Sequence, residues 1–343
     1  MSVKTLQFLI PDAINQLKSD VERRAAGKGA EFHIFRTDDP DDIPKELWER
    51  ADALLVWLAM PINKDVIGRL KRARLVVRGG VGYDHIDGKS LGEAGIPLCN
   101  VPDYGTTDVA DMAMALMLAL ARGITFYHEA LRADIKAGWS SKAAPIVRRI
   151  RGQRFGVVGL GRIGTATALR AKAMGCHVMA YDPYMPWGHE LAVGVERMPS
   201  LEALLKASDV VTLHTPLTDE TRHLIDGRAF SVMKRNAILI NTSRGPVIDI
   251  DALHEALRKR RIAGAGIDVM PDEPPSPDHP LIRAYHEGAA WLNGRLILAP
   301  HAAWYTPESD EDLRRKLVET AMAYMRHGEL RNCVNLQWLT RRR

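Results

Sequence analysis

Short β-rich runs alternate with helical stretches along the whole chain, and this alternation constrains the fold more than any other feature of the sequence. It is typical of parallel sheets whose strands are joined by crossover helices. Later runs such as VVTLH, AILIN and LILA are almost entirely apolar, as strands covered by helices on both faces must be. The sequence therefore predicts an α/β fold of doubly wound parallel sheets.

The expected strands fall into two series, and 343 residues are more than one core usually holds, so two domains are expected. The first series comprises Thr5 to Ile10, Glu31 to Arg36, Ala53 to Trp57, Leu75 to Gly79 and Ile96 to Val101. The second comprises Arg154 to Gly159, His177 to Asp182, Asp209 to His214, Asn236 to Thr242, Ala263 to Val269 and Arg295 to Ala299.

Two helices stand out. Thr106 to Arg122 is apolar almost all round, so we expect it to be buried as a connector at the domain junction or in a subunit interface. Pro307 to Gly328 has acidic residues early and basic residues late, the order that suits a helix dipole.

Composition excludes several classes of protein. With 46% hydrophobic and 26% charged residues the chain is not a disordered one. A net charge of +5 is small for 343 residues, and the basic clusters 148 to 151, 258 to 261 and 341 to 343 are interpreted as solvated surface. No nucleic-acid partner is expected.

Three cysteines, Cys99, Cys176 and Cys333, lie far apart in the sequence without the spacing of a disulfide framework or a metal site, which favours a reducing compartment. The longest apolar run, Met112 to Ala121, has 10 residues, whereas a membrane span needs roughly 18 or more. The apolar patch at the N-terminus is too short for a signal peptide. We expect a soluble cytoplasmic protein with no membrane partner.

A glycine motif, Gly159-Leu-Gly161-Arg162-Ile163-Gly164, joins an expected strand to an expected helix. In such a turn the first glycine permits the tight bend, the second lets the backbone approach a pyrophosphate, and the third lets the helix pack on the strand. The amides of Arg162 and Ile163 would point at the phosphates. This context predicts a dinucleotide site.

Asp182 ends the next strand, where an acid is expected to bind the ribose hydroxyls of the adenosine. A carboxylate there would repel a 2′-phosphate, so NAD is preferred to NADP. Arg162 and His189 leave dual use open.

Three residues follow three successive strands of the second series: Arg244, Glu273 and His301. Ligands of open α/β sheets bind at the carboxyl ends of strands. Arg244 can hold a carboxylate with two hydrogen bonds, His301 can transfer a proton, and Glu273 can fix the imidazole tautomer and favour its charged form. Taken singly, Arg244 could cap a turn and Glu273 could be a solvated loop residue, but their convergence favours a site.

Asp268, expected to be buried, needs a partner, which a nicotinamide carboxamide would supply.

The sequence resembles the NAD-dependent D-isomer-specific 2-hydroxyacid dehydrogenases, and more closely their C-terminal-binding-protein-like branch. The matching stretches are RGGVGYDHID (78 to 87), NVPDYGTTDVAD (100 to 111), FGVVGLGRIGTATALRAKAMG (155 to 175), AYDPY (180 to 184), LHTPLTDETRHLI (213 to 225), INTSRGPVID (240 to 249), GIDVMPDEPP (266 to 275) and PHAAWYTPES (300 to 309).

The resemblance implies two Rossmann-like or flavodoxin-like domains: a discontinuous substrate-binding (catalytic) domain, 1–104 with 302–343, and an NAD-binding Rossmann domain, 105–301. It implies that Arg244, Glu273 and His301 are catalytic. The implied cofactor residues are Gly159, Gly161, Arg162, Ile163, Gly164, Asp182, Thr215, Thr242, Ser243, Asp268 and Thr106. The implied substrate-binding residues are Val81, Gly82, Arg244 and Trp304, and no metal is expected.

The implied function is NAD-dependent interconversion of a D-2-hydroxy acid and its 2-oxo acid by a homodimer, whose interface would involve 106 to 122 and the 130s and 140s. The alternative is an NAD(H)-responsive scaffold, although this chain lacks the long disordered tails of such regulators. Formate or phosphite dehydrogenase activity ranks lower, because those substrates have no side chain to fill a pocket beside Trp304. The stretch 286 to 294 either covers the active site with Trp291 or is a surface loop.

Overall fold

The computed structural model describes residues 5–14 and 17–339, and its α/β fold divides into two compact units. The first unit comprises Met1–Gly105 and Tyr305–Arg343, and the second comprises Thr106–Trp304. The chain thus begins and ends in the same unit. The basic cluster at 341 to 343 lies outside the described residues.

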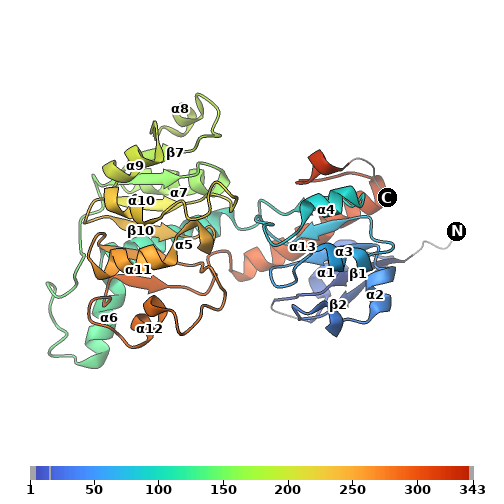
Figure 1. The fold of residues 1–343 in the computed structure, drawn as a ribbon, viewed down its shortest axis with the longest axis horizontal. Coiled ribbons are helices and arrows are strands. Elements are labelled where there is room, and N and C mark those ends of the chain that lie inside the picture. Colours follow the sequence, from blue (N-terminus) through green and yellow to red (C-terminus); the bar gives the residue numbers. More distant parts are fainter. Residues whose placement is uncertain (1–4, 15–16, 340–343) are drawn as a thin grey trace. The chain divides into compact units, whose positions relative to one another are not determined.

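The first unit contains a five-stranded parallel sheet in the order β2-β1-β3-β4-β5 (Figure 1). Its strands are β1 (Leu6–Ile10), β2 (Ala30–Ile34), β3 (Ala53–Val56), β4 (Val76–Arg78) and β5 (Leu98–Asn100). This order is the flavodoxin-like arrangement of a doubly wound sheet.

Helices cover both faces of this sheet. Its helices are α1 (Asp20–Ala26), η1 (Pro40–Asp42), α2 (Lys45–Arg50), α3 (Lys64–Arg69), α4 (Gly88–Glu93), α13 (Pro307–His327) and η3 (Leu336–Trp338). On one face, buried side chains of α2 to α4 such as Trp48 and Leu91 pack on Leu54 and Leu98 of the strands. Helices α1 and α13 pack against one another, and α13 also packs on β3 and β4.

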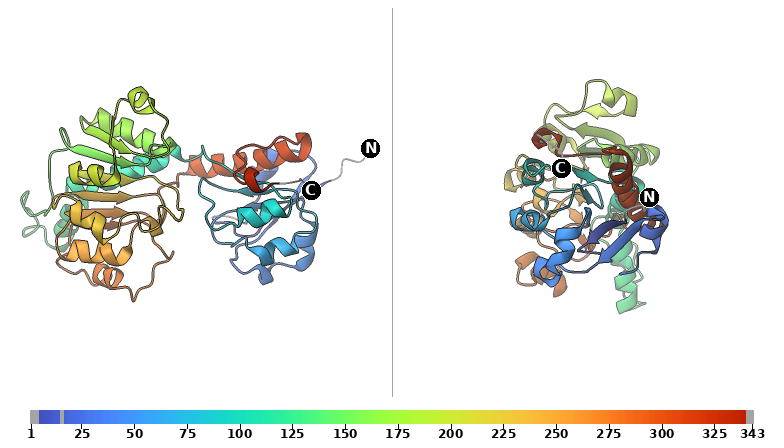
Figure 2. Two further views of the ribbon diagram at one scale, coloured as in Figure 1. Left: turned by 45° about the horizontal axis from the view of Figure 1, so that its top comes forward. Right: turned by 90° about the vertical axis from the view of Figure 1, so that its right-hand side faces the viewer.

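The second unit contains a seven-stranded parallel sheet in the order β12-β11-β10-β9-β6-β7-β8 (Figures 1 and 2). Its strands are β6 (Arg154–Val158), β7 (His177–Tyr181), β8 (Glu196–Arg197), β9 (Val210–Leu213), β10 (Ile238–Asn241), β11 (Gly264–Ile267) and β12 (Leu296–Leu298). Counted from β6, this is the Rossmann strand order with one strand added at the end, and the order reverses between β6 and β9.

All eleven predicted strands are present in the two sheets, to within two residues at each end. The prediction of six strands in the second series was wrong by one, because β8 was missed. That strand has only two residues at the sheet edge, partly or fully exposed, so it leaves no apolar run in the sequence.

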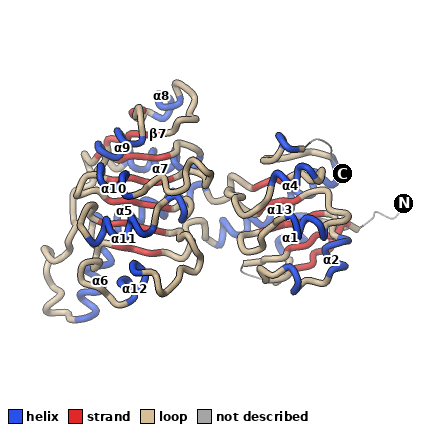
Figure 3. Tube along the Cα trace, in the orientation of Figure 1, coloured by secondary structure: helices blue, strands red, loops and turns tan. Residues whose placement is uncertain are grey.

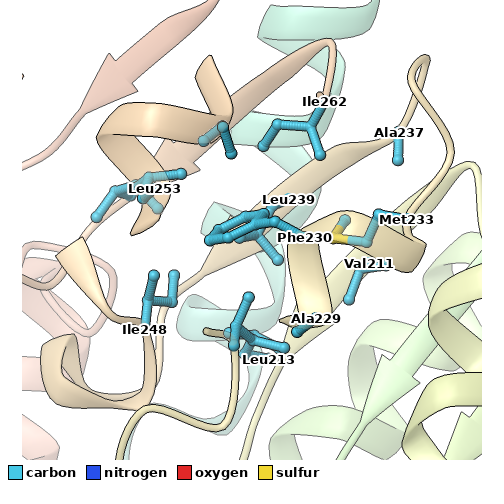
Figure 4. Close-up of a cluster of buried hydrophobic side chains, with 14 of the residues drawn as sticks. Val211, Leu213, Ala229, Phe230, Met233, Ala237, Leu239, Ile248, Leu253 and Ile262 are labelled. Atoms are coloured by element: carbon cyan, nitrogen blue, oxygen red, sulfur yellow. The ribbon is translucent and has the colours of Figure 1, made fainter. Parts of the chain in front are cut away.

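Alternate residues of the central strands face two hydrophobic clusters, so the sheet of the second unit is covered on both sides (Figure 3). Its helices are α5 (Thr106–Ala121), α6 (Ile124–Ala133), α7 (Arg162–Ala173), α8 (His189–Val193), α9 (Leu201–Ala207), α10 (Gly227–Val232), η2 (Gly245–Val247), α11 (Ile250–Arg258) and α12 (Pro280–His286). Ile238 and Ile240 face the side of α5 and α7, whereas Leu239 faces Phe230 and Leu253 of α10 and α11 (Figure 4).

The position of helix α5 in the fold explains its apolar composition. Its buried residues, among them Ala113, Met117 and Leu120, pack on α7, β10 and β11 of the second unit. It is therefore a core helix of that unit.

Within the described ranges, no single helix has both the length and the apolar character to cross a membrane; α5 and α6 pass that test only as a pair bent by 56°.

Candidate active site

The glycine motif forms a closed turn between β6 and α7. Gly159 has a φ of +88°, and a Cβ on it would lie 2.9 Å from the carbonyl carbon and oxygen of His214. A Cβ on Gly164 would lie 2.0 Å from the carbonyl oxygen of Gly159. A side chain at either position would force this turn apart, so both glycines are required by the local geometry.

The middle glycine faces open space. A Cβ on Gly161 would meet no heavy atom within 4 Å. Gly161 caps α7 without a side-chain hydrogen bond, and the first turn of α7, which begins at Arg162, carries no acidic residue. The positive end of the helix dipole and its unbonded amides therefore face a space that a pyrophosphate can enter.

Asp182, at the end of β7, binds this turn directly. Its Oδ2 accepts a hydrogen bond of 2.9 Å from the amide of Leu160, and its Oδ1 accepts one of 2.9 Å from the amide of Tyr184. A carboxylate has about four lone-pair sites, so it can still accept from ribose hydroxyls. Asp182 thus fixes the position of the glycine turn as well as offering acceptors beside it.

Two threonines at neighbouring strand ends carry unsatisfied hydroxyls. Thr215 follows β9 and Thr242 follows β10, and among the described residues neither buried Oγ1 has a hydrogen-bond partner. Leaving a buried polar group unpaired costs about 1–3 kcal/mol. A bound ligand with donors and acceptors can remove that cost, so this edge fits a dinucleotide at the predicted positions.

The loop that carries Arg244 is organised by Asn241, a residue that the sequence analysis missed. The Asn241 side chain is fully buried, accepts from the amide and hydroxyl of Ser243 at 3.0 and 2.7 Å, and donates to the carbonyl of Arg244 at 2.9 Å. The Arg244 guanidinium donates to the carbonyl of Ser243 at 2.9 Å. The polar last residue of the apolar run AILIN was the available signal.

Gly245 brings the Arg244 loop against the loop that leads to Glu273. A Cβ on Gly245 would lie 1.9 Å from the carbonyl carbon of Met270 and 2.3 Å from the nitrogen of Pro271. The two backbones touch where only a glycine fits. The charge of Arg244 also acts on Glu273, where it lowers the pKa.

The expected contact between Glu273 and His301 is present. Glu273 Oε2 lies 2.6 Å from His301 Nδ1, and Glu273 Oε1 accepts from the amide of Met270 at 3.0 Å. Burial by itself would raise the pKa of Glu273, but the hydrogen bond and the charge of His301 outweigh it and lower that pKa below its ordinary value. Glu273 is therefore held as a carboxylate, which orients the ring and leaves Nε2 for chemistry.

Asp268 holds the backbone of the histidine loop. His301 has a φ of +53°, a region that non-glycine residues seldom adopt. Its amide donates to the Asp268 carbonyl at 2.7 Å, and the amides of Ala302 and Ala303 donate to the Asp268 carboxylate at 2.9 and 3.0 Å. Burial raises the pKa of Asp268. The chain's own amides therefore partner this carboxylate, where a nicotinamide carboxamide was expected to supply the donors.

Four other predicted site residues belong to separate segments. Thr106 is the first residue of α5, and half-buried Trp304 follows His301 by three positions at the end of the second unit. In the first unit, the Val81–Gly82 loop is tied to β5, because the Val81 carbonyl accepts from Asn100 Nδ2 at 2.7 Å.

Trp291 does not lie at the carboxyl edge of the sheet, so the possibility that 286 to 294 covers the active site was wrong. Arg295, which precedes β12, donates from its guanidinium to the carbonyls of Trp291, Ile262 and Ala263. The Trp291 ring packs 5.7 Å from that of His254. The stretch therefore packs at the amino ends of β11 and β12, away from His301.

No group of three or more His, Cys, Asp or Glu side chains within the described ranges is arranged to hold a metal ion.

Comparison with known proteins shows the family of this chain. The sequence profile described as D-isomer specific 2-hydroxyacid dehydrogenase, NAD binding domain, matches residues 114–303. The chain belongs to the D-isomer-specific 2-hydroxyacid dehydrogenase family. It is 40% identical to the glyoxylate reductase of Korarchaeum cryptofilum over 287 residues, which are 83% of this chain and 82% of that relative.

Two solved structures share the fold. The D-lactate dehydrogenase of Aquifex aeolicus, complexed with NAD and lactic acid, matches with a TM-score of 0.80 and 29% identity over 93% of this chain and 95% of its own. The NADPH-dependent glyoxylate/hydroxypyruvate reductase of Sinorhizobium meliloti, complexed with NADP and malonate, matches with a TM-score of 0.84 and 26% identity over 99% of each chain. The two Rossmann-like sheets and a nicotinamide dinucleotide cofactor are thus properties of this family member.

Proposed function

We propose that this protein is an NAD-dependent oxidoreductase that interconverts a D-2-hydroxy acid and its 2-oxo acid. The observation that carries the proposal is the bonded pair of His301 and Glu273 at the sheet edge that also holds the glycine turn and Arg244. An acid–base group, a guanidinium and a dinucleotide turn are the parts that this reaction needs.

When bound, the nicotinamide donates or accepts the hydride. His301 Nε2 donates a proton to the carbonyl oxygen during reduction and takes the hydroxyl proton during oxidation. Glu273 keeps the proton on Nδ1 and stabilises the imidazolium. Arg244 binds the substrate carboxylate, because a planar guanidinium is better suited to this than the ammonium group of a lysine. The backbone amides of Val81 and Gly82 are proposed to bind the same carboxylate, and Trp304 to line the pocket.

For the cofactor we propose a preference for NADH over NADPH, with Gly159, Gly161, Arg162, Ile163 and Gly164 around the pyrophosphate and Asp182 at the ribose. The other proposed contacts are Thr106, Thr215, Thr242, Ser243 and Asp268. The Asp182 carboxylate would repel a 2′-phosphate. The matched structures contain NAD in one case and NADP in the other. Measured kcat/KM values with NADH and NADPH decide this, and a higher value with NADPH would contradict the preference.

The test of the function is a turnover assay. Purified protein is mixed with NADH and a panel of 2-oxo acids that differ in side-chain size, including glyoxylate, pyruvate and hydroxypyruvate, and NADH oxidation is followed. Glyoxylate is included because a relative of 40% identity is a glyoxylate reductase. We expect turnover with at least one acid, and a product of D configuration wherever the product is chiral, as it is from pyruvate and hydroxypyruvate but not from glyoxylate. Absence of turnover by folded protein that binds NADH would refute the proposal.

A second candidate function is the NAD(H)-responsive scaffold of the C-terminal-binding-protein-like branch. We propose that the chain belongs to this branch because of Trp304. That residue follows His301 in PHAAWY, where a small residue is common in other branches. The turnover assay separates the candidates, because a scaffold would bind NADH without consuming it.

We also propose a homodimer. Helix α6 has no buried residue, and the segment after it exposes 66% of Ile135 and 78% of Trp139. Exposed apolar side chains that gather on one segment are a feature of contact surfaces. Light scattering should give the mass of two chains, and Trp139→Asp should lower it; a monomeric parent protein would contradict this. The cytoplasmic location stays a prediction.

A further inference from the structure

Two cysteines that are far apart in the sequence are neighbours in the structure. Cys99 lies in β5, the edge strand of the first unit, and Cys333 lies in the segment after α13. They are paired residues of an isolated antiparallel bridge. Their separation along the chain gives no sign of this pairing.

The backbone hydrogen bonds define how the two residues face one another. The amide of Asn100 donates to the carbonyl of Asn332 at 3.2 Å, and that of Val334 donates to the carbonyl of Leu98 at 2.8 Å. This is the pattern of a non-hydrogen-bonded antiparallel pair, in which the Cα atoms are about 4.5 Å apart and side chains approach closely. Disulfides span Cα separations of about 4.4–6.8 Å.

Both thiols also lie on the same face of the sheet. Directly opposed residues of an antiparallel pair share a face, and neighbours along a strand alternate. Leu98 is part of the cluster under α2 to α4, and its opposite residue Val334 packs against that cluster. Cys99 and Cys333 therefore both face the other side. Cys99 is fully buried and Cys333 partly exposed, so a reagent in solution reaches Cys333 first.

We propose that Cys99 and Cys333 are a reversible thiol-oxidation site, which forms a disulfide on reaction with a low-molecular-weight disulfide and fastens the C-terminal segment to β5. Non-covalent contacts already hold this segment in place. The buried Asn335 side chain accepts from the Leu98 amide at 2.8 Å and donates to the carbonyls of Gly88 and Ile96. Oxidation therefore needs no large movement of the chain.

The chemistry is a thiol–disulfide exchange in two steps. The thiolate of Cys333 attacks one sulfur of glutathione disulfide, whose sulfur–sulfur bond breaks, and one glutathione leaves and takes up a proton. The thiolate of Cys99 then attacks the Cys333 sulfur and releases the second glutathione. Two protein thiols are oxidised and one glutathione disulfide is reduced to two thiols.

Cys176 provides an internal control. It lies in the second unit, its thiol donates to the carbonyl of Ile150 at 3.7 Å, and burial raises its pKa. A thiol of raised pKa holds less thiolate and reacts more slowly. The other two cysteines, Cys99 and Cys333, both belong to the first unit.

The experiment treats the whole protein with glutathione disulfide, blocks remaining thiols with iodoacetamide, and measures intact mass and tryptic peptides. We expect loss of two hydrogen atoms, a linked peptide pair containing Cys99 and Cys333, alkylation of Cys176, and full reversal by dithiothreitol. A glutathione adduct that persists on Cys333 beside an alkylatable Cys99, or a link through Cys176, would refute the proposal. So would full alkylation of all three thiols.

Matched variants sharpen the result. Cys176→Ala should still form the link, whereas Cys99→Ala should stop at a stable glutathione adduct on Cys333. If Cys99→Ala does not fold, limited proteolysis of the parent protein gives the same answer. Cleavage in the exposed segment 186 to 188 separates the two cysteines, and the fragments should stay joined in non-reducing gels only after oxidation. Fragments that separate after oxidation would refute the link.

Discussion

The polar side chains at the two edges of the seven-stranded sheet differ in their hydrogen-bond partners. At the amino edge, buried Arg295 donates to the carbonyls of Leu257, Ile262, Ala263 and Trp291, and Lys234 pairs with Asp209 at 2.8 Å. At the carboxyl edge, the hydroxyls of Thr215 and Thr242 are left without partners among the described residues. The charged groups at the amino edge stabilise the fold through the chain's own carbonyls and carboxylates. Buried atoms of Arg148 and Gln153 there also lack partners among the described residues, so the contrast rests on the two hydroxyls beside the glycine turn, where a dinucleotide is expected.

The backbone at the carboxyl edge is also tightly constrained. At the carboxyl edge Gly159 and His301 have positive φ angles, and Gly245 touches the Met270–Pro271 backbone. For a non-glycine residue such as His301, a positive φ costs about 1–3 kcal/mol and persists only where surrounding contacts impose it. Asp268 supplies such contacts for His301. The hydrogen bonds of Asp268 thus hold the backbone of the His301 loop in place.

The largest expected effect belongs to His301. His301→Asn removes the acid–base group, so kcat for 2-oxo acid reduction should fall about 10²–10⁴-fold. NADH binding, measured by fluorescence titration, should be unchanged, because the glycine turn is untouched. A variant with normal kcat would show that proton transfer takes place elsewhere.

Gly245→Ala should displace the two touching loops, because its Cβ would lie 1.9 Å from Met270. A misplacement of about 1 Å costs about 10²-fold in rate, so kcat/KM should fall by that order. Gly227→Ala is the matched control, since a Cβ there meets no atom within 4 Å and activity should be retained. Equal activity of both variants would show that loop contact does not position the site.

Glu273→Gln keeps the shape of the side chain but removes the charge beside His301 Nδ1. A hydrogen bond to a charged group contributes about 1.5–3 kcal/mol, so kcat should fall about 10- to 10²-fold. The lowered pKa of Glu273 means that the parent protein keeps this carboxylate as pH falls below the ordinary value of 4.5. Without the carboxylate, the charged form of His301 is less favoured. As pH rises, the rate of reduction by the variant should therefore begin to fall at a lower pH than the rate of the parent protein. An unchanged pH–rate profile would exclude this role.

His214 provides the smallest effect, on stability. Burial lowers its pKa from 6.5 to about 3 in the folded chain. As pH falls below 6.5, the unfolded chain takes up this proton first, so stability decreases between pH 6.5 and 3, by about 2 kcal/mol at pH 5. Urea unfolding of His214→Gln should show a smaller loss between pH 7 and 5. Thr212→Val, which keeps His214 but removes its 2.9 Å partner, should keep the parent's loss. Equal losses in His214→Gln and the parent would contradict this.

Sequence reasoning reached the features that repeat or end at strand boundaries. The apolar runs predicted the strands, and Arg244, Glu273 and His301 were chosen because they follow successive strands. Sequence reasoning missed contacts between residues that are far apart in the sequence. The pairing of Cys99 with Cys333 needs the C-terminal segment to return to β5, and no local pattern encodes that.

Other misses have local causes. Asn241 was missed because it was taken as the end of a buried strand. Its hydrogen bonds to Ser243 and Arg244 depend on the turn of the loop after that strand, which the apolar pattern does not predict. Trp291 was considered as a cover for the site because it lies between Glu273 and His301 in sequence, but its loop enters β12 from the amino end. Distance along the chain is a poor guide to which sheet edge a loop occupies.

Two arginines test most directly the claim that the carboxyl edge serves catalysis and the amino edge serves stability. The measurement is kcat/KM for 2-oxo acid reduction by Arg244→Met and Arg295→Met, with urea unfolding of each protein alongside. Arg244→Met should lose about 10²-fold in kcat/KM and little stability, because the lost charge pair with substrate is worth about 2–5 kcal/mol. Arg295→Met should retain kcat/KM while folded but lose about 3 kcal/mol or more of unfolding free energy, because buried carbonyls lose charged donors. Loss of activity in Arg295→Met with full activity in Arg244→Met would contradict it.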